Sequence, residues 1–317
     1  MYRRTVSLTH SQGIEFGPES APFNLDNEPA YSRWRAHKLR HYPASVEEQR
    51  VPIGRLGRLN AAQQEDLTHA CRRANFALYT TDPEIPPTRE ALRAFAKRLG
   101  LAHFDQHLWA PQEGIVALRR ETGSRRANYI PYTDRPMKWH TDGYYNSPDA
   151  AVRGVVMHCV APAADGGANW LLDPEMLYIA MRDANPAFIE ALMHPGVMTI
   201  PENTLEPGVH RPAVSGPVFS IDPGDSALHM RYTARTRSIS WKDDAVTRDA
   251  VSFLEELLTP PVSFAFRVCL SAGEGIVCNN VLHNREAFTD APDTKQQRLV
   301  WRARYRDRIA GTTSWRE

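Results

Sequence analysis

The stretch Trp139-His140-Thr141-Asp142-Gly143 places an imidazole and a carboxylate two positions apart. On an extended segment side chains alternate between the two faces, so His140 and Asp142 are expected to point to the same side. Two such ligands hold a divalent metal only loosely, and a third has to come from another part of the chain. His283 lies 143 residues later (283 − 140), within Asn279-Asn280-Val281-Leu282-His283-Asn284-Arg285, and offers that ligand. Two histidines and one carboxylate that leave open positions are typical of non-haem Fe(II) sites.

Composition and charge describe an ordinary globular chain. Of the 317 residues, 42% are hydrophobic and 24% are charged, and the formal net charge is +1, so we expect no nucleic-acid partner. No apolar run approaches the roughly 18 residues of a membrane span, and no signal peptide follows Met1, so we expect no membrane partner and a cytoplasmic location. The four cysteines show no Cys-x-x-Cys spacing and are expected to be free thiols. The sequence leaves a homo-oligomer open.

Local patterns predict strands that are flanked by helices. Helices are expected after the cap residues Asn60, Thr88, Asp173 and Asn185. An amphipathic helix is expected from Asp244 to Leu258. Strands are expected at Phe76 to Thr80, Gly114 to Arg120, Ala151 to Val160, Asn169 to Leu172, Phe264 to Leu270, Gly275 to Asn279 and Arg298 to Tyr305. Bringing distant strands together requires a folded-over sheet, which predicts an α+β fold with a mainly β core, a double-stranded β-helix or jelly roll with flanking helices.

Two regions are expected to differ from this core. Residues 1–55 read as an irregular N-terminal extension with one helical candidate around Ala30 to Arg40, and residues 56–317 read as a single domain. Residues 201–224 contain five prolines and three glycines. That composition predicts a long loop, which we interpret as a lid-like insertion.

Four segments together resemble one enzyme family. They are Lys138 to Tyr144, Gly166-Gly167-Ala168-Asn169, Gly273 to Phe288 around His283, and Arg298-Leu299-Val300-Trp301-Arg302. In this order they resemble the taurine dioxygenase-like (clavaminate synthase-like) Fe(II)/2-oxoglutarate oxygenases over roughly residues 60–308. The resemblance implies a jelly-roll core, Fe(II) held by His140, Asp142 and His283, and 2-oxoglutarate and O2 as co-substrates.

The resemblance also implies roles for polar residues around the metal. Arg298 is expected to pair with the distal carboxylate of 2-oxoglutarate, because a guanidinium matches a carboxylate bidentately. Arg302, on the same strand face, is expected to reach the iron-bound end of 2-oxoglutarate or the substrate. Asn169 stands where the family usually has a threonine, which places its contact with 2-oxoglutarate in doubt. The 15 residues from His283 to Arg298 are a longer interval than the family pattern predicts, so an enlarged loop is expected around Pro292.

The substrate side of the site is less well defined by sequence. Tyr144, Tyr145 and Trp241 either line the substrate pocket or pack as core aromatics, and the sequence does not separate these two interpretations. Arg235 and Arg237 are candidates for binding an anionic group, and a solvent-exposed position explains them equally well. We therefore expect a small, polar, partly anionic substrate such as an amino-acid derivative.

These observations favour a 2-oxoglutarate-dependent oxygenase that hydroxylates an unactivated carbon and releases succinate and CO2. Aspartate at position 142 favours hydroxylation or desaturation over halogenation, because glycine or alanine there would leave room for halide. Three alternatives stay open: an inactive relative or sensor that binds 2-oxoglutarate without turnover, a zinc hydrolase, and a structural His140–Asp142 pair. The arginine-rich run from Arg298 to Arg308 has its own alternatives, a solvated edge strand or a nucleic-acid patch.

Overall fold

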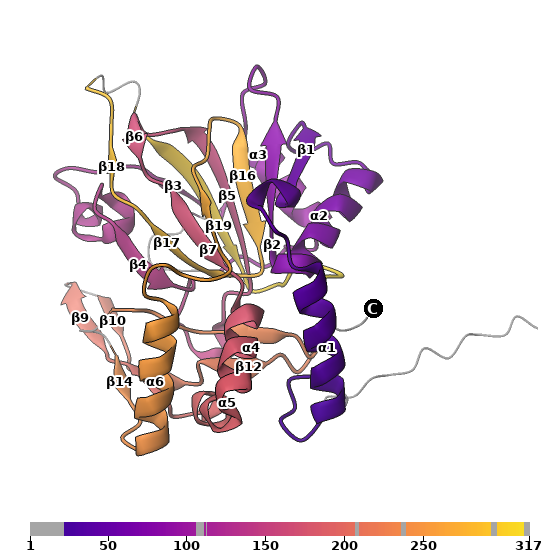
Figure 1. Ribbon diagram of the computed structural model, residues 1–317. Coiled ribbons are helices and arrows are strands. Elements are labelled where there is room, and N and C mark those ends of the chain that lie inside the picture. The colour runs from indigo at the N-terminus through magenta and orange to yellow at the C-terminus, as the bar shows by residue number, and fades with distance from the viewer. Residues whose placement is uncertain are drawn as a thin grey trace, which may run out of the picture.

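Two sheets packed against each other form the centre of the molecule (Figure 1). The computed structural model describes residues 22–105, 111, 113–206, 209–235, 239–292 and 297–313. The six-stranded sheet has the order β1-β2-β16-β5-β19-β3, and the four-stranded sheet has the order β15-β7-β17-β4. The strands of the larger sheet are β1 (Arg50–Gly54), β2 (Phe76–Thr81), β16 (Glu274–Cys278), β5 (Gly154–Ala161), β19 (Leu299–Tyr305) and β3 (Ile115–Leu118). Those of the smaller sheet are β15 (Ala265–Val268), β7 (Asn169–Leu172), β17 (Leu282–Arg285) and β4 (Met137–His140).

Shorter strands and six helices complete the described part of the chain. The short strands are β6 (Asp165–Gly166), β8 (Met198–Ile200), β9 (Asn203–Glu206), β10 (Val209–Arg211), β11 (Val214–Gly216), β12 (Phe219–Ile221), β13 (Leu228–Met230), β14 (Ser240–Trp241) and β18 (Phe288–Thr289). The helices are α1 (Glu28–His41), α2 (Ala61–Ala74), α3 (Arg89–Arg98), α4 (Pro174–Ala184), α5 (Pro186–Met193) and α6 (Ala245–Leu257). Single 3-10 turns occupy Val46–Gln49, Arg125–Asn128, Ile130–Tyr132 and Pro148–Ala150.

Alternation along the strands builds the core between the sheets. In β5, Val155, Met157 and Cys159 point inward, where they pack with Leu171 and Val268 of the smaller sheet. These apolar side chains are removed from water, which is the main favourable contribution to folding. The mainly β core with flanking helices that the sequence predicts is therefore confirmed.

Helices α2 and α3 cover the outer face of the larger sheet (Figure 1). Asn60 and Gln63 form a reciprocal capping box at the start of α2, and the Thr88 side chain accepts from the Ala91 N–H at the start of α3. Leu67 on α2 and Phe95 on α3 pack with the outward-facing residues of β2 and β19. Both helices form where their cap signals predict them.

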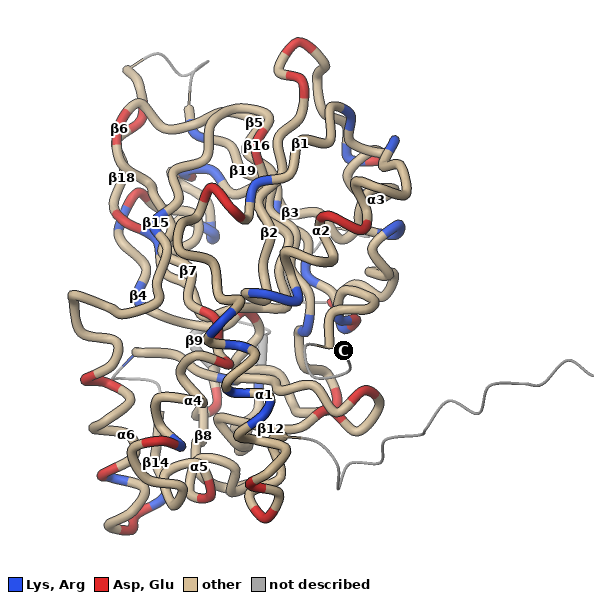
Figure 2. Tube along the Cα trace, turned by 45° about the vertical axis from the view of Figure 1, so that its right-hand side comes forward, with Lys and Arg blue, Asp and Glu red and all other residues tan. Residues whose placement is uncertain are grey.

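A second hydrophobic cluster joins α1, α4, α5 and α6 to the short strands in the lower half of Figure 1. The side chains of Asp173 and Asn185 cap α4 and α5 as predicted, and Asp244 caps α6. Lys38 of α1 is 3% exposed and its Nζ lies 2.6 Å from Asp173 and 2.5 Å from Glu175. This buried ion-pair cluster ties α1 to the start of α4. Figure 2 shows basic and acidic residues interspersed along the trace, in keeping with the net charge of +1.

Residues 1–55 were expected to form an irregular N-terminal extension. The structure differs in residues 22–55, which contain a helix and a strand. The helical candidate is α1, and β1 pairs in parallel with β2 as the edge strand of the larger sheet. Pro52 weakens the strand signal in the sequence, but an edge strand tolerates proline because one side of it forms no ladder. Residues 1–21 lie outside the described part of the chain.

The long loop expected for residues 201–224 is also wrong in part. Strands β9 and β10 pair with each other, β11 pairs with β8, and β12 pairs with β13. Each of these strands has three or four residues. Such strands are too short for periodicity to reveal, and the prolines between them mark turns instead.

Candidate active site

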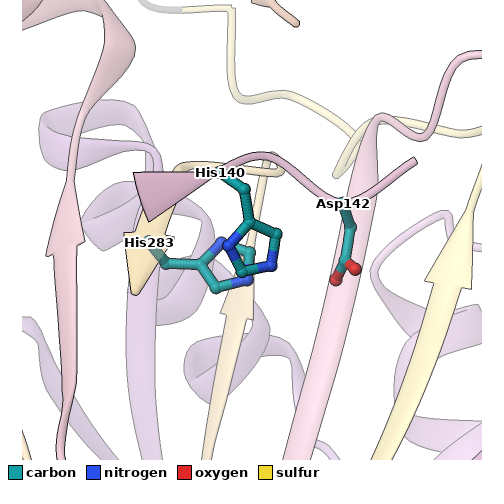
Figure 3. A group of neighbouring side chains, drawn as sticks. All are labelled: His140, Asp142 and His283. Atoms are coloured by element: carbon teal, nitrogen blue, oxygen red, sulfur yellow. The ribbon is translucent and has the colours of Figure 1, made fainter. Parts of the chain in front are cut away.

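Two neighbouring strands of the smaller sheet bring the two distant histidines together. His283 on β17 is the register partner of His140 at the end of β4, and their ring centroids are 4.3 Å apart. Asp142 lies in the turn that follows β4, so it is not placed by strand alternation. Ligand atoms of the three residues lie within 4.8 Å of one another. Figure 3 shows the three side chains as neighbours. The structure thus gathers the three metal ligands that the sequence predicts.

Hydrogen bonds to the backbone orient both imidazoles. Nδ1 of His140 lies 2.9 Å from the Lys138 carbonyl, and Nδ1 of His283 lies 2.9 Å from the Val281 carbonyl. A carbonyl accepts only, so each Nδ1 carries the proton and each Nε2 keeps its lone pair. Among the described residues, neither Nε2 has a hydrogen-bond partner. Each ring can therefore offer Nε2 to a metal.

The protonation states suit metal binding. Burial, with the neighbouring His283, lowers the pKa of His140 to about 3, and burial also lowers the pKa of His283. Burial opposes ionisation of Asp142, but the guanidinium groups of Arg302 and Arg304 outweigh it and hold the pKa of that carboxyl well below its usual range. At neutral pH the cluster contains two neutral imidazoles and one carboxylate, which are the forms that coordinate metals.

The two carboxylate oxygens of Asp142 have different surroundings. Oδ1 accepts a hydrogen bond of 2.8 Å from Nη1 of Arg302 and lies 3.6 Å from Nη1 of Arg304. Oδ2 is buried and has no hydrogen-bond partner among the described residues. An unsatisfied buried carboxylate oxygen is costly, and a cation beside the two imidazoles would satisfy it. The residues present therefore fit a divalent metal such as Fe(II).

Arg298 is buried beside the turn that precedes β7. Its side chain is 7% exposed, its guanidinium lies 5.0 Å from the centre of the Phe288 ring, and burial lowers its pKa. A Cβ at Gly167 would lie 3.5 Å from its Nε. Asn169, also 7% exposed, follows two residues later at the start of β7. Within the described chain the Arg298 guanidinium has no carboxylate partner, so it is available to an anion.

The two arginines of β19, Arg302 and Arg304, also face inward. Arg302 and Arg304 are 8% and 4% exposed and share a strand face with Val300 in the core between the sheets. The solvated-edge interpretation is therefore wrong, because β19 lies between β5 and β3. Arg302 binds Asp142 rather than standing free. Arg304, which the sequence analysis did not assign to the site, forms an ion pair with Asp105. Its position two residues after Arg302 on a strand was the signal that could have placed it there.

The aromatic residues after the ligand pair lie among arginines. The Tyr145 hydroxyl accepts a 3.0 Å hydrogen bond from Nη1 of Arg304, and Arg211 lies 5.7 Å from the Tyr145 ring centre. Tyr144 packs edge-on against Tyr145 at 5.2 Å. Its pKa is raised chiefly by burial, and the charge of Arg235 opposes that rise.

The segment before Arg235 lies beside the end of β4. Thr233 bridges to His140, and the Ala234 N–H donates to the Trp139 carbonyl at 2.8 Å. Arg235 is half-buried, whereas Arg237 lies outside the described residues. Trp241 on β14 packs, half-buried, against the cluster of helices.

A jelly-roll core that holds a buried His-Asp-His cluster is the arrangement that the resemblance to Fe(II)/2-oxoglutarate oxygenases implies. Residues 38–304 match the family model described as taurine catabolism dioxygenase TauD, TfdA family, and the chain belongs to this family. It is thus a 2-oxoglutarate-dependent dioxygenase, and its family uses Fe(II), 2-oxoglutarate and O2. The described residues contain no helix that is both long and apolar enough to cross a membrane.

The individual proteins that resemble this chain have low sequence identity to it. The chain is 28% identical over 195 residues to a uridine-5'-phosphate dioxygenase from a Streptomyces species. The aligned part covers 60% of this chain and 68% of the relative. Among solved structures, a variant of the non-haem iron oxygenase OrfP in complex with (3S)-hydroxy-L-Arg has a TM-score of 0.58 at 17% identity, covering 91% of each chain. The PvcB protein from Pseudomonas aeruginosa has a TM-score of 0.54 at 17% identity, covering 80% of this chain and 83% of the other. Asparagine oxygenase has a TM-score of 0.51 at 16% identity, with 80% and 84% covered. These structural likenesses show the fold alone.

Proposed function

We propose that the chain hydroxylates a carbon of a small, polar, anionic substrate, with Fe(II) held by His140, Asp142 and His283 and with 2-oxoglutarate held at its distal carboxylate by Arg298. The observation that carries the metal assignment is the buried Oδ2 of Asp142, which has no hydrogen-bond partner in the described part of the chain and lies beside two neutral imidazoles. In the overall reaction, 2-oxoglutarate, O2 and a C–H bond give succinate, CO2 and an alcohol. The zinc-hydrolase alternative has no support from a family of dioxygenases.

The three proposed metal ligands and Arg298 each have a defined part in this proposal. The carboxylate of Asp142 and the two neutral imidazoles leave open positions for the co-substrate and O2. The Arg298 guanidinium neutralises the far end of a dianion in a buried site, where charge pairing is stronger than in water. Fe(II), when bound, supplies the redox chemistry that couples decarboxylation to C–H oxidation.

The first experiment measures Fe(II) binding without O2 and succinate release in air. Asp142→Ala and His283→Ala should each lose stoichiometric Fe(II) binding and succinate formation, because two ligands hold the metal only loosely. His158→Gln is the matched control, since His158 is equally buried but stacks on Tyr79, away from the cluster. Full activity in either alanine variant would remove the metal assignment. Retained 2-oxoglutarate binding without succinate from the wild type would instead indicate a sensor.

The anionic substrate is supported by two independent observations. The curated relative is named for uridine-5'-phosphate, a small anionic molecule. Tyr144 and Tyr145 follow the ligand pair. The charge of Arg235 acts on Tyr144, and Arg211 lies over the ring of Tyr145. A fixed guanidinium suits a carboxylate, sulfonate or phosphate, so nucleoside monophosphates join amino-acid derivatives as the leading classes.

The second experiment tests substrate class by the substrate-stimulated release of succinate. The panel contains nucleoside monophosphates, the matching nucleosides, amino acids, sulfonates and long-chain acids. We expect an anionic compound to stimulate release and Arg235→Ala to raise its KM at least tenfold. The exposed Arg248→Ala variant serves as the control, because within the described chain the ion pair of Arg248 is with the exposed Asp243. Stimulation by long-chain apolar compounds alone, unchanged in Arg235→Ala, would contradict the proposal.

A further inference from the structure

Asn280 makes three hydrogen bonds from one buried side-chain amide. The side chain is 2% exposed. Its Oδ1 accepts from the backbone N–H of Asp142 at 2.8 Å. Its Nδ2 donates to the Asp142 carbonyl at 2.9 Å and to the Val152 carbonyl at 2.6 Å. One side chain thus holds both backbone polar groups of Asp142, whose own side chain belongs to the cluster in Figure 3.

The position of Asn280 in the chain links it to the second histidine as well. It lies in the connection between β16 of the larger sheet and β17 of the smaller sheet, three residues before His283. The next residue, Val281, provides the carbonyl that lies against Nδ1 of His283. Two consecutive residues therefore fix the turn that carries Asp142 and the ring orientation of His283.

The chemistry at this position requires asparagine. The backbone has φ of 51°, in the left-handed region that asparagine and glycine adopt most readily. The three partners are one donor and two acceptors, and only an amide offers both an acceptor and two N–H donors at this length. Glycine would tolerate the backbone but lose the bonds, and aspartate would lose the donors.

We propose that Asn280 is a positioning residue for the metal site, which sets where the carboxylate of Asp142 stands relative to the two imidazoles. The inference rests on the proposed ligand set. Groups that orient metal ligands typically change metal affinity by 10–100-fold when they are removed. A role confined to folding would change stability and leave the bound metal as it is.

The neighbouring Asn279 provides a matched control. It is 6% exposed, and its amide also makes three hydrogen bonds. They join it to Asn75, Thr312 and the N–H of Ile309, and none of these is a proposed ligand. Asn279→Gly and Asn280→Gly therefore remove equivalent sets of bonds, with only the second set reaching Asp142.

The experiment titrates Co(II) into the metal-free full chain and follows the visible absorption, with thermal unfolding of each metal-free variant measured in parallel. We expect both glycine variants to lose stability. Asn279→Gly should bind Co(II) within twofold of the wild type and with the same visible band. Asn280→Gly should bind at least tenfold more weakly, with a shifted band. Equal affinities in the two glycine variants would overturn the proposal.

Two further outcomes are decided by the same titration. If Asn280→Gly does not fold, Asn280→Asp replaces it, and the visible band is then the criterion because the added charge also acts on affinity. An Asn280→Asp band identical to that of the wild type would overturn the positioning role. A wild type that binds no Co(II) would remove the metal site itself, and with it this role of Asn280, whereas wild-type binding that is unchanged in Asn280→Gly removes the positioning role alone.

Discussion

Two buried arginines, Arg302 of β19 and Arg298 just before that strand, have different surroundings. Arg302 is bound to Oδ1 of Asp142, so it fixes which carboxylate oxygen stays free for a metal. Arg298 has no carboxylate partner among the described residues and lies against the Phe288 ring. The Asp290 carboxylate acts on Arg298 from a distance but forms no ion pair with its guanidinium within the described chain, so Arg298 is the better candidate to receive an incoming anion.

Replacing Arg298 with leucine should separate co-substrate binding from metal binding. The loss of a charged hydrogen-bonded contact is expected to weaken 2-oxoglutarate binding at least tenfold, or about 1.4 kcal/mol, with Fe(II) affinity retained. Arg302→Leu should instead weaken Fe(II) binding, because it frees Oδ1 of Asp142. Anaerobic titrations of both variants with Fe(II) and then with 2-oxoglutarate distinguish the two roles. The reverse pattern would show that the two arginines have exchanged them.

At the scale of elements, the segment from β9 to β12 lies beside the residues that follow the ligand pair. Arg231 connects the two regions. It is 7% exposed and donates from Nε to the Tyr144 carbonyl at 2.7 Å, and from Nη1 and Nη2 to the carbonyls of Met198, Gly216 and Val214 at 3.0, 3.3 and 3.0 Å. We propose that residues 201–224 act as a lid over the site, since closing segments commonly exclude water from such chemistry.

Arg231→Leu should loosen this segment, because four carbonyl groups lose their shared donor. We expect faster proteolysis within residues 201–224 and a loss of at least about 2 kcal/mol in the free energy of unfolding. In the wild type, Fe(II), 2-oxoglutarate and substrate together should slow cutting in the same segment. Limited proteolysis with mass spectrometry of the fragments measures both effects, and equal cutting with and without ligands would contradict the lid.

How far the sequence determined these elements depended on whether their signals are local. Helices α2 and α4 were predicted because Asn60 and Asp173 cap them from the adjacent sequence. The edge strand β1 was missed because its stability comes from pairing with β2. The two histidines were predicted as ligands by their motifs. Asn280 and Arg304 were not assigned to the site, because their partners Asp142 and Tyr145 are more than 130 residues away in the chain and only the fold brings them close.

For the molecule as a whole, buried neutral histidines make the metal-free protein sensitive to acid. Burial lowers the pKa of His158 to about 4, and the pKa of His140 falls to about 3. Both groups have pKa values near 6.5 when exposed, so below that pH the unfolded chain binds more protons than the native one. Stability contributed by the neutral forms is fully present above about pH 6.5 and is lost as the pH falls towards about 4.

Removing one of these groups should therefore flatten the pH dependence. In His158→Gln, with metal chelated, the free energy of unfolding should fall less steeply between pH 6 and pH 4.5, by up to about 1.4 kcal/mol per pH unit. His158 is a suitable probe because its Nε2 is buried without a partner among the described residues. Urea unfolding at a series of pH values measures the slope. An unchanged slope would mean that His158 is protonated in the native state.

The register that pairs His140 with His283 also constrains how the molecule reaches its native state. Contacts between such distant residues close large loops, and chains rich in them fold slowly. The complete ligand set exists only after β4 and β17 have paired, so a metal ion cannot nucleate folding by binding early. Bound Fe(II) should therefore lower the unfolding rate and leave the folding rate unchanged, as expected for an interaction absent from the transition state. The iron centre would then set the lifetime of the native fold, and the chain alone would set the time needed to form it.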